Sequence, residues 1–114
     1  MTMKLGETGK RIVVATGFDM SSNTSLQMRF KSPTGVSSTV TASLGGTSLS
    51  VTYEDGSAAT LTANEWMYWD VDNTTTIDIA GTWQVEGIYN NTGATPDDIH
   101  IGGTATFTVL ENLA

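Results

Sequence analysis

The strongest constraint on the fold is a strict alternation of apolar and polar residues near the end of the chain. In residues 104–109, Ala105, Phe107 and Val109 alternate with threonines. A matching segment, residues 82–86, lies shortly before it. A period of two places alternate side chains on opposite faces of a β-strand. The two segments therefore predict paired strands with one face in a core and the other in water.

The same pattern recurs in earlier parts of the chain. Residues 25–31 alternate, with Leu26, Met28 and Phe30 on the predicted inner face. Further strands are expected over residues 10–16, 36–42, 49–53 and 65–72, and the penultimate strand is expected to run to about Tyr89. The segment 10–16 is more evenly apolar than the others, so it could be buried on both faces or could pair with another chain.

Turn residues separate the predicted strands. Pro33 and Gly35 favour a β-turn, since proline presets the second position and glycine accepts a positive φ. Residues 58–64 are interpreted as a loose stretch and residues 90–98 as a long loop, followed by a short edge piece at 99–101. No segment of useful length has the period of a helix.

Strands at this spacing predict an all-β chain, an immunoglobulin-like β-sandwich of about seven antiparallel strands. Residues 1–114 are expected to form a single domain, with short arms at Met1–Gly9 and Leu110–Ala114. The predicted core contains four large side chains, one from each of four segments: Leu26, Phe30, Trp83 and Phe107.

Composition narrows the possible partners. The chain has 114 residues, a net charge of −7 and no cysteine. Too few Lys and Arg residues are present to neutralise phosphates, which argues against a nucleic acid partner. No apolar run has the length of a membrane span, and residues 1–6 do not begin a signal peptide. The lack of cysteine suits folding in a reducing cytoplasm.

The sequence offers little for catalysis. It contains no Gly-x-Ser-x-Gly, P-loop or His-Glu-x-x-His pattern. His100 is the only histidine, so a nucleophile paired with histidine is almost excluded. We therefore expect no enzymatic activity, no catalytic residues and no cofactor.

Two sets of residues, each containing aspartate, are weak candidates for metal binding. Asp98 and His100 lie on the same side of an extended segment, and Asp70 and Asp72 share a strand face near Asp78. The first group suits a transition metal and the second calcium. Solvated side chains are the more common explanation of both patterns, so no metal site is predicted.

The most aromatic segment carries the candidate interaction residues. If Met67, Trp69 and Val71 face the core, Trp66 and Tyr68 point outward. An exposed pair of this kind could anchor a protein interface or stack on a sugar ring. Alternatively, both side chains could be covered by the chain itself, for instance by residues 58–64.

Four short segments, in order, resemble a known family. These are Gly6-Glu7-Thr8-Gly9, Phe30-Lys31-Ser32-Pro33-Thr34-Gly35, Ala80-Gly81-Thr82-Trp83-Gln84-Val85 and Ala105-Thr106-Phe107-Thr108-Val109. Together they resemble the N-terminal domain family of phage upper baseplate proteins, which are immunoglobulin-like modules of tailed-phage virions.

The resemblance implies a structural role in the virion. The expected partners are other virion proteins. Many copies of the chain are expected in a symmetric assembly, with contacts through sheet edges and the two arms. The better-known family members continue into a fibre-like region, whereas this chain ends at Ala114, so we expect a standalone adaptor or packing module of the neck, tail or baseplate. The alternatives are a capsid decoration protein and a carbohydrate-binding module.

Overall fold

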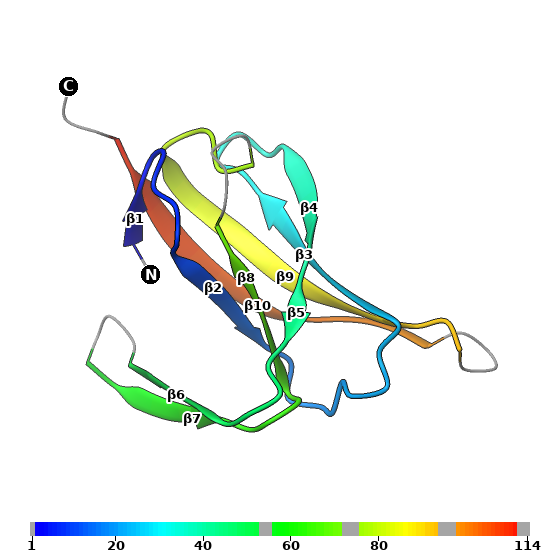
Figure 1. Cartoon of the computed structure of the whole chain (residues 1–114). Coiled ribbons are helices and arrows are strands. Elements are labelled where there is room, and N and C mark those ends of the chain that lie inside the picture. The colour runs from blue at the N-terminus through cyan, green and yellow to red at the C-terminus, as the bar shows by residue number, and fades with distance from the viewer. Residues whose placement is uncertain (1, 53–55, 72–75, 94–97, 112–114) are drawn as a thin grey trace.

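The computed structural model describes residues 2–52, 56–71, 76–93 and 98–111 (Figure 1). In these ranges the chain is all-β, with ten strands and no helix, and therefore no helix that could cross a membrane. The strands are β1 Thr2–Lys4, β2 Arg11–Ala15, β3 Ser25–Lys31, β4 Ser37–Thr41, β5 Ser43–Leu44, β6 Leu49–Thr52, β7 Ala58–Leu61, β8 Trp66–Asp70, β9 Gly81–Asn91 and β10 Asp98–Leu110.

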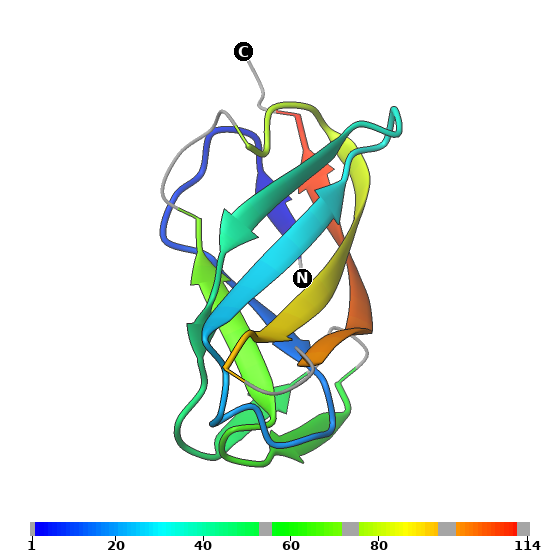
Figure 2. The same ribbon diagram turned by 90° about the vertical axis from the view of Figure 1, so that its right-hand side faces the viewer.

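Two sheets face each other, and a hairpin extends from one end of them. The larger sheet has the order β1-β10-β9-β3-β4, and the smaller has the order β2-β8-β5. Strands β6 and β7 form a separate two-stranded sheet. Figures 1 and 2 show the two layers and, at one end, the β6–β7 hairpin standing apart from them.

The core lies between the two sheets. Leu26, Phe30, Trp83 and Phe107, the four residues expected there, are all buried in one cluster. The Phe30 ring from the larger sheet lies 5.4 Å from the Trp69 ring of the smaller one, between ring centroids. Because alternate residues of β3 and β9 are apolar, each strand presents a continuous apolar row to this cluster.

Strand β3 and the turn after it follow the sequence pattern closely. The strand spans the predicted residues, and Gly35 has a φ of 89°, which glycine adopts without strain. The Gly35 N–H donates to the Ser32 carbonyl at 2.9 Å, which closes the β-turn. Val36, the first residue of the strand expected over residues 36–42, precedes β4, which begins at Ser37, and its side chain is 66% exposed.

Several expectations about the strands are corrected by the structure. The strands outnumber the predicted seven or so, and one pair is parallel. Residues 58–64, expected to be loose, contain β7, which pairs with β6. The 99–101 edge piece is part of the long strand β10. Residue 53 and residues 94–97 of the predicted elements lie outside the described residues.

The N-terminal arm, expected at Met1–Gly9, is partly docked on the larger sheet. Its residues Thr2–Lys4 form β1, which runs parallel to the end of β10. Met3 is buried in the core cluster, and the Leu5 N–H donates to the Leu110 carbonyl at 2.9 Å. The apolar side chain of Met3 explains the docking, because a strand with one apolar residue on its inner face can join a sheet edge.

A β-bulge divides β10 into two parts. The register with β9 shifts between Gly102 and Thr104, and Gly103 has a φ of 68°. At this point β10 lies directly against the end of β2, because a Cβ atom on Gly103 would overlap the carbonyl oxygen of Ala15. The bulge therefore brings an edge of the larger sheet to the smaller one.

Candidate functional site

Trp66 is not part of an exposed aromatic surface. It is 4% exposed, and its indole N–H donates to the Thr47 carbonyl at 2.8 Å. The backbone of Gly45 lies against the indole so closely that a Cβ atom there would overlap the ring. The side chain is thus covered by the turn after β5, which agrees with the alternative that the chain itself covers it, although residues 45–47 provide the cover in place of residues 58–64.

Tyr68 is half-buried, and its ring contacts an ion pair. The guanidinium carbon of Arg11 lies 4.0 Å from the centroid of the Tyr68 ring. Arg11 donates from Nε to Oδ1 of Asp70 at 2.8 Å and from Nη2 to Oδ2 at 3.1 Å. These hydrogen bonds hold the pKa of Asp70 below its ordinary value and raise that of Arg11. Tyr68 therefore supports a surface cluster within its own chain, and the Trp66 ring, 5.6 Å away between centroids, is buried beside it.

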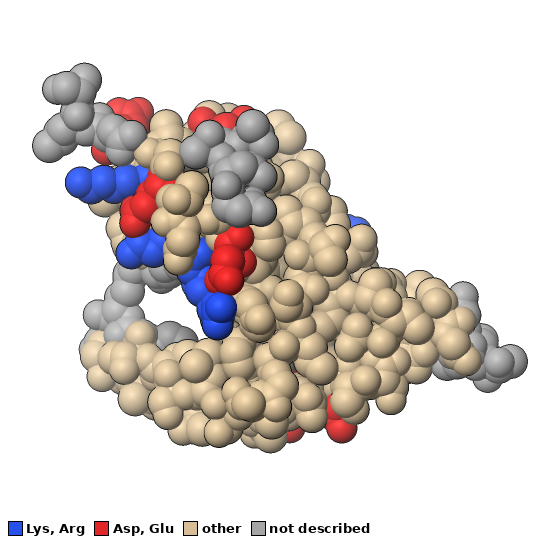
Figure 3. All heavy atoms as spheres, viewed as in Figure 1, with Lys and Arg blue, Asp and Glu red and all other residues tan. Residues whose placement is uncertain are grey.

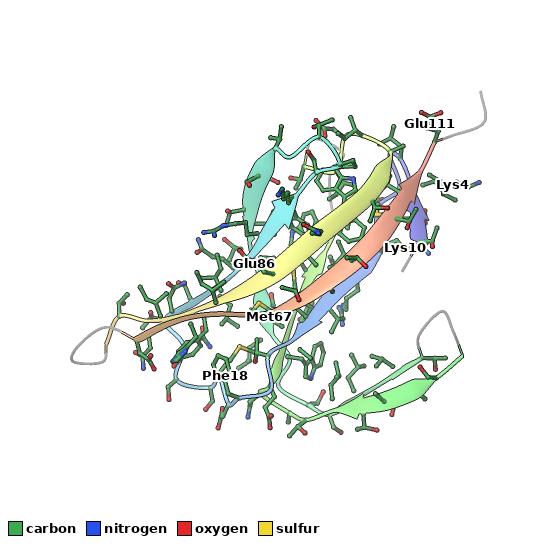
Figure 4. All side chains as sticks on the ribbon, turned by 180° about the vertical axis from the view of Figure 1, so that it is seen from behind. Lys4, Lys10, Phe18, Met67, Glu86 and Glu111 are labelled. Atoms are coloured by element: carbon green, nitrogen blue, oxygen red, sulfur yellow. The ribbon has the colours of Figure 1, made fainter. Side chains whose placement is uncertain are left out.

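Asp98 and His100 meet, as the sequence pattern suggested. The Nε2 atom of His100 lies 2.7 Å from Oδ1 of Asp98, and both side chains are about half exposed. The imidazole also lies near the rings of Phe18 and Tyr89, with centroid distances of 5.2 and 5.9 Å. Figure 4 shows Phe18 beneath the long β9–β10 ribbon. The pair therefore lies on the surface at this end of β10, beside two aromatic rings.

No metal centre is assembled in the part of the chain that the structure describes. No three His, Cys, Asp or Glu side chains come together there. Asp72, one of the three carboxylates considered for calcium, lies outside the described residues. Asp70, the second, is bound to Arg11.

A groove runs between β2, β10 and the β6–β7 hairpin, and sequence reasoning missed it. Its volume is about 490 Å³. The floor is apolar, with Val85, Ala105 and Phe107, and the hairpin contributes Val51 and Leu61. Figure 3 shows the hollow between the hairpin and the two sheets, with charged side chains gathered at one side of it.

The groove exists because, among the described strands, β2 has no neighbour on one side and β10 is covered there only near its end. β2 is an edge strand of the smaller sheet, bonded only to β8. β10 is covered by β1 only along residues 108–110. The sequence signal for this open edge is the evenly apolar character of residues 10–16, which is compatible with pairing to another chain.

Comparison of the sequence with known families and with curated proteins gives no match. No model of a known protein family matches the chain, and no curated protein is significantly similar to it. The resemblance to the phage baseplate family therefore rests on the four short segments alone.

Proposed function

We propose that this chain is a non-enzymatic structural protein of a tailed-phage virion, built on an immunoglobulin-like β-sandwich. Its partners are other virion proteins, and its role is that of an adaptor or packing module in the neck, tail or baseplate. The alternative within the same class is a capsid decoration protein. The placement of the four family-like segments in the fold is the observation on which the proposal depends.

The four segments lie at turns and strand ends of this fold. Residues 6–9 form the link from β1 to β2, in which Gly6 and Gly9 both have a φ of 85°. Residues 30–35 close the β3–β4 hairpin, and residues 80–85 enter β9. The last segment is the end of β10, whose register pairs Phe107 with Trp83.

The strand order supports the immunoglobulin-like part of the proposal. In that fold, strands B, E and D share one sheet and strands C, F and G share the other. Here β2, β8 and β5 correspond in chain order to B, E and D, and β3, β9 and β10 to C, F and G. β4 then takes the position of C′, and β6 and β7 are an added hairpin between D and E.

The carbohydrate alternative loses its main support. It rested on Trp66 and Tyr68 forming an exposed aromatic platform, and Trp66 is buried against Gly45. A half-buried Tyr68 beside an arginine is common on protein surfaces and does not by itself indicate a sugar site.

The virion role is tested by mass spectrometry of phage particles purified from the cells that carry this gene. We expect peptides of the chain to co-purify with the major capsid protein at a fixed ratio. Separating tails from heads before the measurement distinguishes a tail or neck module from capsid decoration. Finding the chain only in the particle-free lysate would rule out both.

A further inference from the structure

The groove between β2, β10 and the hairpin has two rows of backbone groups along its sides. The Thr16 N–H donates to the Glu65 carbonyl, and the Val71 N–H to the Lys10 carbonyl. These bonds show that the peptide groups of residues 10 and 16 point toward β8. Because this direction alternates along a strand, the peptide groups of residues 12 and 14 also point toward β8. The peptide groups of Arg11, Val13 and Ala15 therefore point away from β8, toward the groove.

Peptide groups of β10 form the opposite side of the groove. The Leu110 carbonyl accepts from Leu5 on the β1 side of β10. By alternation, the peptide groups of Thr108, Thr106 and Thr104 point the same way. β1 pairs with β10 only at residues 108–110, so within the described residues Thr106 and Thr104 have no strand on this side.

The groups that border the space between these two rows are those that would pair with one further β-strand. Its residues Val85, Ala105 and Phe107 offer an apolar floor, and Val51 and Leu61 face it from the hairpin. A two-stranded hairpin alone is marginally stable in water, so its half-buried apolar face gains from a cover. Unpaired strand edges beside an apolar groove are the arrangement that accepts a β-strand from another chain.

The bulge limits the length of such a strand. Gly103 lies against Ala15 and closes one end of the groove. The open stretch is therefore that of β2, five residues or roughly 17 Å of extended chain. Among the described residues that line the groove, Arg11 is the one charged residue, and its guanidinium is already bound to Asp70, so the groove itself is close to neutral.

We propose that this groove binds an extended segment of another polypeptide by strand addition. The segment has about four or five residues in the groove and apolar side chains at alternate positions. The proposal is independent of the virion role. A groove that binds no strand would leave that role standing, and absence of the chain from particles would leave the groove standing.

The test uses the full chain and a pool of synthetic peptides of about eight residues, in which Val or Ile alternates with Ser or Thr. Binding is measured by fluorescence polarisation. The control pool has the same sequences with alternate backbone nitrogens methylated, which keeps the side chains and removes hydrogen-bond donors. We expect saturable binding of the first pool, and binding of the control pool to be weaker by about tenfold or more.

A pair of proline variants locates the bound strand. Thr106→Pro removes an N–H that points into the groove, and leaves the bonds between β10 and β9 intact. Thr39→Pro makes the same change on the free edge of β4, far from the groove in sheet order. Binding of the peptide pool should fall about tenfold in Thr106→Pro and stay unchanged in Thr39→Pro. Val13→Pro gives the same test from β2 if Thr106→Pro does not fold.

Three results would overturn the proposal. They are no saturable binding of the unmethylated pool, equal binding of both pools, or equal binding by the folded groove variant and by Thr39→Pro. The first shows that no strand is accepted, the second that backbone bonds are not used, and the third that the strand binds elsewhere.

Discussion

Replacing Trp83 by alanine is expected to lower the free energy of unfolding by about 3–5 kcal/mol. The side chain is 1% exposed and lies between the two sheets. Its ring stacks on Phe107, with centroids 6.2 Å apart, and its indole N–H donates to the Ile79 carbonyl at 2.9 Å. Alanine removes the ring from the core, leaves a cavity, and leaves that carbonyl without its donor.

Denaturant unfolding followed by tryptophan fluorescence and circular dichroism measures the loss. Thr82→Ala is the matched control, because Thr82 is the exposed neighbour on the same strand. The control should change stability by no more than about 0.5 kcal/mol. A loss below about 1 kcal/mol in Trp83→Ala would mean that the ring is not in a tightly packed core.

The second large effect is expected at the bulge of β10. Gly103→Ala should cost about 3 kcal/mol, since two penalties combine. Gly103 has a φ of 68°, which disfavours any side chain. The added Cβ atom would also overlap the Ala15 carbonyl and lie 2.8 Å from Cγ1 of Val14. Both contacts are on β2, whose backbone is held by β8, so relief requires the two sheets to move apart.

Gly102→Ala is the matched control for this prediction. A Cβ atom on Gly102 would have no atom within 4 Å, and its φ is not in the left-handed region. We expect a change of less than about 1 kcal/mol there. Thermal unfolding of the two variants side by side decides the matter. Equal losses in both would contradict the close approach of β10 to β2.

The parts of the fold with strict alternation were predictable from the sequence. β3 has the expected bounds, and the four expected core residues are buried. In these segments every second side chain is large and apolar, so local pattern and tertiary packing agree.

The failures come from contacts between segments far apart in sequence. The alternation of β8 predicts Trp66 on the solvent side, but Gly45, in the turn after β5, leaves room for the indole to lie against the backbone. β1 and β7 were missed because short strands carry too few residues for a period to be recognised.

The groove could not be predicted for a related reason. It is defined by which strands lack neighbours, and strand order is a property of the whole topology. The sequence of residues 10–16 showed only that β2 is apolar on more than one side. The parallel docking of β1 on β10 then determined that the open edge begins beyond Thr108.

Amide hydrogen exchange, measured residue by residue by NMR on the free protein, tests the two open edges most directly. The backbone amides of Val14 and Phe107 point toward the partner strands β8 and β9. Those of Val13 and Thr106 point toward the groove. If the two edges are open, the amides of Val14 and Phe107 exchange slowly and those of Val13 and Thr106 exchange fast. Equal protection at neighbouring positions on both strands would show that the edges are already paired, and would contradict the account.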